Sequence, residues 1–395
     1  MLDGHSAAAL AITRSAGRGG HWVAVGANRN LFAAAKLSRY CRMGFDYPVS
    51  TDEPNAFVNC VLEFVRKHAI DLVLPVTDWT LGPLSDQRDR FAGVCIVAMP
   101  SESALSLASD KYRTIELARS LGMEVPRSEL IASAADLSPW ERSEFPVVIK
   151  DRFSARWAQD RAVLGSVTYA YSAAELRAKV AERLTTVCDV LVQEFVSGTG
   201  IGFSCFAVGG KTVLPFQWQR VREIDPRGSA SSARKSVPLD SSIAAASTGL
   251  ILAMGFEGLA MVEYKRTTEG RVVLMEINGR PWGSIGLPLA CGIDYPRCWI
   301  NWSLNGTLPP EMVSYRDNLL CRRLVSELTH LANIRRGRPP NWSVPYPNFW
   351  TTLIRMAVPW RPGMCYDDLW LSDLRPGVVG ISHWFRSRMR RKSGN

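Results

Sequence analysis

The segment of residues 259–280 constrains the fold more than any other part of the chain, because it has the pattern of a β-hairpin with acidic residues on one face. Two strand-like runs flank Glu269 and Gly270, a pair of residues typical of a tight turn. If these two residues form the loop, Glu263 and Glu276 pair directly, with Cβ atoms about 5 Å apart. The hairpin therefore predicts two opposed carboxylates.

Opposed carboxylates repel each other, so we expect a positive group between them. Mg²⁺, with Mn²⁺ as an alternative, suits this position because it binds hard oxygen ligands from one or two carboxylates together with phosphates. Side chains alternate along a strand, so Asn278 and Arg280 share the face of Glu276, and an arginine there suits a phosphate. The alternative is a solvated hairpin face on which Lys265 or Arg271 neutralises the acids.

Helix and strand patterns alternate over the first hundred residues, which predicts a small parallel sheet with crossover connections. No GxGxxG motif is present, so no dinucleotide site is assigned. Residues 2–5 have the pattern of the end of a strand-to-helix turn, so we expect the first strand of this sheet to be missing. Helices are predicted at residues 7–15 and 55–68. Strands are predicted at residues 22–26, 71–75 and 94–98.

The pattern after Ser109 becomes a mixture of helices and longer strands. A helix is expected from Ser109 to about Gly122, with Asp110 near its N-cap and Gly122 as its C-cap. Strands are expected at residues 145–150 and 190–195, and helices at residues 173–184 and 242–254. Residues 202–208 and 213–218 are further segments of this mixed body. We therefore divide the chain into residues 1–108, 109–308 and a basic, Trp- and Pro-rich extension at 309–395.

The net charge of +10 is concentrated in the C-terminal part. Residues 313–395 contain 14 Lys and Arg against 5 Asp and Glu, which leaves a nearly neutral body and argues against a nucleic-acid partner. A basic amphipathic helix at residues 378–392 could contact an anionic membrane surface, or it could pack on the body. The nine cysteines never form a CxxC pair, and the first twenty residues lack the apolar run of a signal peptide. These features favour a cytoplasmic protein, with peripheral membrane contact left open.

Several short motifs, taken in their order along residues 1–308, resemble the ATP-grasp superfamily. The motifs are residues 109–111 with 121–126, 147–150, 192–198, 261–264 and 274–280. This resemblance implies an α/β and α+β chain with the ATP-grasp fold, in which two α+β subdomains clasp ATP behind a small parallel-sheet domain. The small lid would span about residues 125–195, and the larger catalytic subdomain residues 196–308.

The resemblance also implies roles for individual residues. Lys111 and Lys150 would contact the phosphates of ATP, a task suited to a compact charge. The hinge that holds adenine and ribose would comprise Gln193, Glu194, Phe195 and Val196. The metal ligands would be Glu263, Glu276 and Asn278. Arg280 would be the catalytic cation at the γ-phosphate.

A narrower similarity is to the carboxylate–amine ligase-like or carbamoyl-phosphate-synthase-like branch of the superfamily. It rests on residues 216–223, 228–236, 280–284 and 290–296. It implies Arg234 as a second catalytic guanidinium, and substrate contacts from Arg220, Arg222, Ser231, Ser232, Gly283 and Ser284. Many relatives cover the phosphates with a glycine-rich loop, yet residues 151–161 contain no glycine. Either Arg152 and Arg156 replace that loop, or turnover is impaired.

The function implied is that of an ATP- and Mg²⁺-dependent ligase. It would activate a small carboxylate as an acyl phosphate for attack by an amine or a similar nucleophile. The alternatives are a carbamoyl-phosphate-synthase-like phosphotransferase and an ATP-binding scaffold or sensor without turnover. The partners expected are small molecules, and the sequence leaves a homodimer open.

Overall fold

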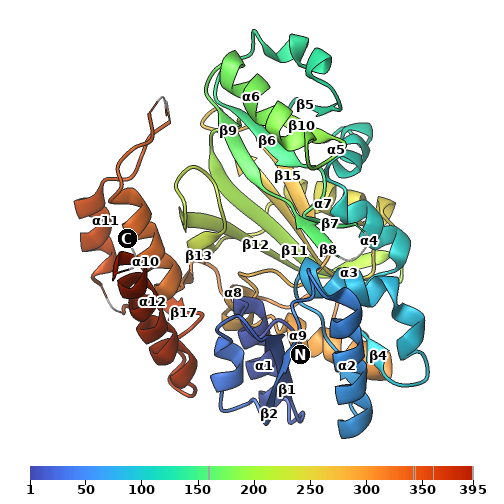
Figure 1. The fold of residues 1–395 in the computed structure, drawn as a ribbon. Coiled ribbons are helices and arrows are strands. Elements are labelled where there is room, and N and C mark those ends of the chain that lie inside the picture. The colour runs from blue at the N-terminus through green and yellow to red at the C-terminus, as the bar shows by residue number, and fades with distance from the viewer. Residues whose placement is uncertain (159–160, 341, 343, 359, 394–395) are drawn as a thin grey trace.

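A seven-stranded sheet forms the centre of the fold in the computed structural model, which describes residues 1–158, 161–340, 342, 344–358 and 360–393 (Figure 1). Neighbouring strands are antiparallel, except that β16 and β17 are parallel. The strands in spatial order are β15 (Val272–Asn278), β14 (Gly258–Arg266), β11 (Thr199–Val208), β12 (Lys211–Glu223), β13 (Ser231–Ser236), β16 (Leu320–Arg322) and β17 (Met364–Tyr366).

The β14–β15 hairpin pairs Glu263 with Glu276, as the sequence predicts, but its turn differs from the prediction. The loop spans residues 267–271 and is closed by the Thr267 N–H, which donates to the Arg271 carbonyl at 2.9 Å. A bulge beside Glu263 adds one residue, Met275, to β15 and restores the predicted pairing. Bulges re-aim side chains, and here both Met275 and Glu276 face the same cavity.

Both faces of the central sheet are buried, which explains the nearly continuous apolar sequence of β11. Ile201, Phe203 and Cys205 pack under helix α7 (Ser241–Ala253), whereas Phe206 and Val208 pack against α8 (Gly286–Ala290) and α9 (Tyr295–Asn305). The core formed with α8 and α9 also contains apolar residues of helix α1 (Ala7–Arg18). The N-terminal region therefore shares apolar packing with the central sheet.

The N-terminal region holds two parallel strand pairs: β1 (Ala24–Asn28) with β2 (Met43–Tyr47), and β3 (Leu72–Val73) with β4 (Ile96–Val97). The extended residues 1–4 join the pairs, because the Gly4 N–H donates to the Gly26 carbonyl and the Leu2 N–H to the Leu74 carbonyl, both at 3.0 Å. No strand precedes α1 in the described part of the chain, and the extended residues 1–4 bridge the two strand pairs through these hydrogen bonds. Helices in this region are α1, α2 (Pro54–His68), α3 (Asp78–Asp86) and α4 (Glu102–Ser109).

The helix predicted to open at residues 109–111 begins as expected, with Asp110 as its N-cap. Helix α4 ends at Ser109, and α5 (Lys111–Ser120) begins after Asp110, whose carboxylate accepts from the Arg113 N–H at 3.1 Å. The same carboxylate accepts from Arg152 at 2.7 Å. Aspartate is a favoured N-cap because its oxygen satisfies a free backbone N–H, and this cap makes Lys111 the first residue of α5.

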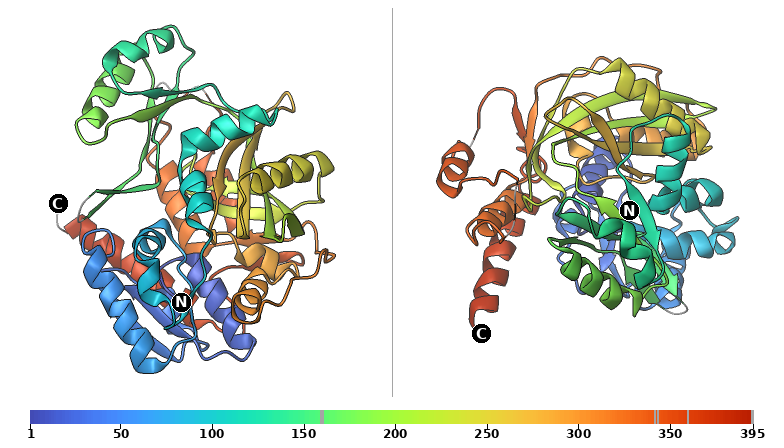
Figure 2. Two further views of the ribbon diagram at one scale, coloured as in Figure 1. Left: turned by 90° about the vertical axis from the view of Figure 1, so that its right-hand side faces the viewer. Right: turned by 90° about the horizontal axis from the view of Figure 1, so that it is seen from above.

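A smaller four-stranded sheet stands above the N-terminal region (Figure 2). Its strands in spatial order are β5 (Ser128–Ile131), β10 (Val190–Glu194), β6 (Val147–Asp151) and β9 (Val167–Ala170). Helix α6 (Ala173–Leu184) packs on this sheet. The hairpin of β7 (Ala155–Ala158) and β8 (Arg161–Leu164) extends from it toward the N-terminal region.

The C-terminal extension is part of the central sheet, because its strands β16 and β17 form one edge of that sheet. Its helices are α10 (Leu324–Ile334), α11 (Phe349–Met356) and α12 (Arg375–Ser393). In α12 the Trp384 indole N–H donates to the Thr329 hydroxyl at 2.9 Å, and His383 stacks on Phe32. Helix α12 therefore packs on the body of the protein, which is the alternative that the sequence left open. The described part of α12 does not support contact with a membrane. Among the described residues, no helix is both long and apolar enough to cross a membrane.

Candidate functional site

A cavity of about 400 Å³ lies between the small sheet and the central sheet. Ten apolar or aromatic side chains line it: Val148, Val167, Tyr169, Phe195, Val196, Ala230, Met261, Tyr264, Met275 and Trp282. The lining also includes six cationic side chains and three carboxylates, namely Lys111, Lys150, Arg220, Arg227, Lys265, Arg280, Glu194, Glu263 and Glu276. A molecule with a flat apolar part and a polyanionic part matches this lining.

The two lysines reach the cavity from opposite elements. Lys150, on β6, donates from Nζ to Gln193 Oε1 at 2.7 Å, and Lys111, at the start of α5, donates to the Ser154 hydroxyl at 3.1 Å. Burial lowers the pKa of Lys150 to about 8 and also lowers the pKa of Lys111, against the opposing effect of Glu276. A bound anion would raise the pKa of both lysines and so favour the charged form of each.

Gln193 differs from the other predicted hinge residues. Its side chain is fully buried, accepts from Lys150 and donates from Nε2 to the Ser128 hydroxyl at 2.9 Å. It therefore positions Lys150 and does not line the cavity, whereas Glu194, Phe195 and Val196 do.

The opposed carboxylates already have a positive neighbour. Arg220, on β12, donates to Glu263 and also to Glu223 at 3.0 Å. Burial raises the pKa of Glu263 to about 7, although Arg220 acts in the opposite direction. Asn278 lies beside Glu276, with its amide nitrogen 3.4 Å from Oε1.

The donor set of Glu263, Glu276 and Asn278 fits a hard divalent cation, because all three offer oxygen ligands. Within the described part of the chain, no three His, Cys, Asp or Glu side chains gather into a metal site. A cation held here would thus need further oxygens from a bound phosphate, which is how Mg²⁺ is commonly bound.

Arg280 follows β15 and crosses to the N-terminal region. Its Nε donates to Asp78 Oδ2 at 2.9 Å, where Asp78 is the first residue of α3. This contact fixes the guanidinium at the cavity wall and ties the central sheet to the N-terminal region. No local motif could have indicated Asp78, because its partner lies 202 residues later.

Comparisons with known proteins identify the architecture. A family model described as "ATP-grasp in the biosynthetic pathway with Ter operon" matches residues 186–324. The L-amino acid ligase from Bacillus licheniformis aligns with a TM-score of 0.58 and 16% identity, over 77% of this chain and 73% of the ligase. The chain has the ATP-grasp fold.

Two further solved structures share the ATP-grasp fold with this chain. Biotin carboxylase from Campylobacter jejuni, in complex with β,γ-ATP, aligns with a TM-score of 0.62 and 15% identity, over 81% of this chain and 73% of that one. N5-carboxyaminoimidazole synthetase from Staphylococcus aureus aligns with a TM-score of 0.59 and 13% identity, over 80% of this chain and 78% of that one. No curated protein matches the chain in sequence.

In this ATP-grasp fold, only two of the seven residues suggested by the narrower similarity line the cavity, namely Arg220 and Gly283. Arg234, predicted as catalytic, is only 1% exposed and donates to Asp367 Oδ1 at 2.5 Å. Arg222 donates to Glu327 at 2.9 Å. The cavity lining also lacks Ser231, Ser232 and Ser284. The structure does not bring these five residues into the lining of this cavity.

The segment in which a phosphate cover was expected, residues 151–161, runs from the end of β6 into the β7–β8 hairpin. Arg152, expected to replace a glycine-rich loop, is held by Asp110 at 2.7 Å and Asp189 at 3.0 Å. The side chain of Arg156 lies outside the described residues. The sequence analysis missed three cavity residues, Tyr169, Arg227 and Lys265, as functional candidates. Only Lys265 carried a signal, because its alternation places it on the face of Glu263.

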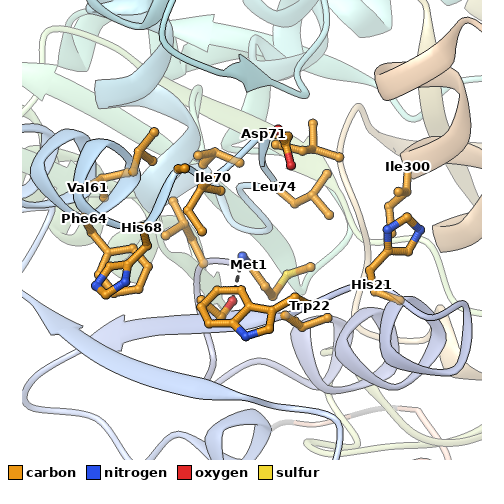
Figure 3. Close-up of a pocket in the computed structure, with 18 of the residues that line it drawn as sticks. Met1, His21, Trp22, Val61, Phe64, His68, Ile70, Asp71, Leu74 and Ile300 are labelled. Atoms are coloured by element: carbon orange, nitrogen blue, oxygen red, sulfur yellow. Dashed lines mark hydrogen bonds between the residues drawn. The ribbon is translucent and has the colours of Figure 1, made fainter.

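A second cavity of about 290 Å³ lies in the N-terminal region and is a poor candidate for ATP (Figure 3). Its labelled side chains are mainly apolar, and the only titratable ones are His21, His68 and Asp71. Neither lysine nor arginine contributes to its lining. A triphosphate needs cationic or backbone N–H partners, so the cavity between the two sheets is the candidate site.

Proposed function

We propose that this ATP-grasp protein is an ATP-dependent ligase that activates a carboxylate as an acyl phosphate for attack by an amine. The observation that carries the proposal is the convergence of Lys111, Lys150 and Arg280 with the opposed Glu263 and Glu276 in one partly apolar cavity. Cations suit the phosphates and the apolar wall suits adenine.

The reaction proposed has two steps. A carboxylate oxygen of the substrate attacks the γ-phosphorus, the bond to the β-phosphate oxygen breaks, and ADP leaves. The amine nitrogen then attacks the acyl carbon, phosphate departs with the electrons of the C–O bond, and the nitrogen gives up a proton. Enclosure between the two sheets protects the acyl phosphate from water.

Six of the cavity residues have a role in this scheme. Lys150, oriented by Gln193, and Lys111 bind phosphate oxygens. Arg280, held by Asp78, stabilises the negative charge that develops on the transferred phosphoryl group. Glu263, Glu276 and Asn278 are the residues that would hold Mg²⁺, which when bound would neutralise phosphate charge.

Two alternatives stay open. A carbamoyl-phosphate-synthase-like phosphotransferase would use the same cations with carbamate as the phosphate acceptor. An ATP-binding scaffold is favoured by one observation, which is that Arg152 is engaged by Asp110 and Asp189 in a cover segment without glycine.

The first test is release of ADP and phosphate from the full chain with Mg-ATP, screened against pooled carboxylates, amino acids and amines. Glu276→Gln is expected to lower turnover at least 100-fold, since it removes one of two carboxylates from the metal site. Glu269→Gln is the matched control, because Glu269 is an exposed residue of the hairpin loop and should leave turnover unchanged.

The outcomes separate the three functions. Release that needs both a carboxylate and an amine supports the ligase. Release with bicarbonate and ammonia alone supports the phosphotransferase. Mg-ATP binding by calorimetry without turnover in any pool supports the scaffold, and unchanged turnover in Glu276→Gln contradicts the assignment of Glu276.

A further inference from the structure

The C-terminal extension reaches the candidate ATP site through one buried side chain, that of Trp342. This residue follows α10, is 2% exposed and does not itself line the cavity. Its ring lies against the ring of Phe195 with centroids 5.3 Å apart, and against the ring of Tyr169 with centroids 5.9 Å apart. Both of those rings line the cavity. Trp342 therefore packs against two aromatic side chains of the site.

The three rings form a closed set, because Tyr169 and Phe195 also contact each other, with centroids 6.0 Å apart. The interplanar angles of the three pairs are 71°, 74° and 87°, and such edge-to-face arrangements are favoured by aromatic pairs. Tyr169 belongs to β9, Phe195 to the connection between β10 and β11, and Trp342 to the extension. The orientation of the two cavity rings thus depends on a third ring outside the cavity.

Trp342 makes these contacts with its ring and not with its polar group. Its indole N–H is buried and has no hydrogen-bond partner among the described residues. The backbone at this position is fixed, because the Trp342 carbonyl accepts from Arg338 Nε at 2.6 Å. An aromatic ring without the N–H, such as that of phenylalanine, should therefore preserve the contacts.

The position of Tyr169 also determines a second wall of the cavity. Its hydroxyl donates to the Arg227 carbonyl at 2.9 Å, and both Arg227 and Gly228 line the cavity. A Cβ at Gly228 would lie only 2.9 Å from that hydroxyl, so glycine lets the loop of residues 224–230 pass this close. A shift of the Tyr169 ring would thus move this loop as well.

Helix α10 of the extension supports the same loop at its start. His330 Nδ1 donates to the Glu223 carbonyl at 2.6 Å, and Asn333 Nδ2 donates to the Ile224 carbonyl at 3.0 Å. The extension therefore supports two walls of the ATP cavity, the aromatic pair and the loop. The matching family model ends at residue 324, so the family resemblance assigns no role to Trp342.

The aromatic pair belongs to the part of the cavity that suits a nucleobase. Tyr169 pairs with Val148 across β9 and β6, Val196 follows Phe195, and all four side chains line the cavity. Flat apolar surfaces bind ring systems, whereas phosphates need cations or N–H donors. A change in the aromatic pair should therefore affect binding of the base of ATP and not of its phosphates.

We propose that Trp342 is a positioning residue of the ATP site, which holds Phe195 and Tyr169 in the orientation that accepts adenine. The extension is then part of the nucleotide site, although Trp342 does not touch the nucleotide. This inference rests on the placement of ATP in this cavity under the proposed function, but it does not depend on turnover.

The test compares two probes by calorimetric titration of the full chain. Mg-ATP carries the base, and Mg-tripolyphosphate carries three phosphates without a base. Trp342→Leu keeps an apolar side chain but removes both ring contacts, so we expect it to weaken Mg-ATP binding about tenfold. Binding of Mg-tripolyphosphate should stay within about twofold of the wild type, because the phosphate partners are unchanged.

Three further variants make the test specific. Trp342→Phe keeps a ring and should bind Mg-ATP within about threefold of the wild type. Trp350→Leu, at a residue of α11 that is 67% exposed, is the control that should change neither affinity. If Trp342→Leu does not fold, Trp342→Met takes its place, because the longer side chain fills more of the space of the indole without supplying a ring.

Unchanged Mg-ATP affinity in Trp342→Leu overturns the proposal. An equal loss for both probes also overturns it, because it indicates a general loss of structure, and so does an equal loss in Trp342→Phe and Trp342→Leu. If tripolyphosphate binds too weakly to be measured, the comparison of Trp342→Phe with Trp342→Leu on Mg-ATP decides alone.

The same titrations separate this proposal from the proposed function. A wild-type chain that does not bind Mg-ATP rejects both. Mg-ATP binding without turnover in any substrate pool rejects the ligase, and the difference between Trp342→Phe and Trp342→Leu then still supports the positioning role. Turnover with an unchanged KM for ATP in Trp342→Leu keeps the ligase and rejects the positioning role.

Discussion

At the residue scale, the candidate ATP site holds two groups whose pKa values are displaced toward neutrality. Burial drives both displacements: it raises the pKa of Glu263 to about 7 and lowers that of Lys150 to about 8. Displaced values of this kind are typical of functional sites. The consequence is a narrow pH range in which the carboxylate and the ammonium are both charged.

We therefore predict that the affinity for Mg-ATP is greatest between about pH 7 and 8. Below pH 7 Glu263 becomes protonated and loses its value as a metal ligand, and above pH 8 Lys150 loses the charge that binds phosphate. Affinity should fall by up to about tenfold per pH unit on each side, until the pKa of the complex is reached. Calorimetric titrations from pH 6 to 9 would measure this profile.

Lys150→Arg is the control for the alkaline side, because arginine stays protonated throughout this range. In this variant the affinity for Mg-ATP should no longer fall above pH 8, but it should still fall below pH 7. A wild-type affinity that is constant across the range would contradict the assignment of both groups.

The residue scale also shows what the sequence could predict. Alternation places Glu263 and Glu276 on one face of the hairpin, but their direct pairing depends on the loop of residues 267–271 together with the bulge at Met275. The burial of Arg234 depends on Asp367, which lies 133 residues later, and the placement of Arg280 depends on Asp78. An isolated arginine in a strand gives no signal of which distant carboxylate it will meet.

At the element scale, the register of the central sheet depends on close contacts that only glycine permits. Arg220 reaches Glu263 by passing over Gly200 of β11, where a Cβ would lie 2.5 Å from the Arg220 Cδ. The sequence predicted most helices and strands, because periodicity and caps are local. It did not predict the bulge at Met275, which depends on the neighbouring strand.

Gly200→Ala is expected to destabilise the chain by about 1–3 kcal/mol, the usual cost of overpacking, and to displace Arg220 from Glu263. Gly249→Ala is the matched control, because Gly249 lies within α7 with no atom within 4 Å of an added Cβ. That control should be neutral or slightly stabilising. Denaturant unfolding and Mg-ATP titration of both variants measure the two effects, and equal stability of the two would contradict the steric argument.

At the scale of the whole molecule, the extension and the N-terminal region are joined by a buried arginine. Arg14 of α1 is fully buried and donates from Nε to Asp373 at 2.8 Å. It also donates to the backbone carbonyls of Asp367 and Asp368, at 2.6 and 3.2 Å. The sequence could not predict this contact, and the boundary placed at residue 309 crosses the central sheet that β16 and β17 extend.

Arg14→Met is expected to destabilise the chain by about 3–5 kcal/mol, because it leaves a buried carboxylate without its partner. Arg29→Met should cost only about 0–1 kcal/mol, since the pair of Arg29 with Glu53 is exposed. The double variant Arg14→Met with Asp373→Leu should recover part of the loss but not all of it, because the carbonyls also lose their donor. Denaturant unfolding compares the three variants, and similar stabilities for the two single variants would refute the argument.

The contact between Arg14 and residues 367–373 also has a consequence for biosynthesis. Domains begin to fold while the ribosome is still extending the chain, yet α1 cannot bury its arginine with a partner until those late residues have emerged. A chain that stops early would retain an unmatched charge in its first helix and would be unstable. Chains that end before Asp373 should therefore be less stable than chains that include it.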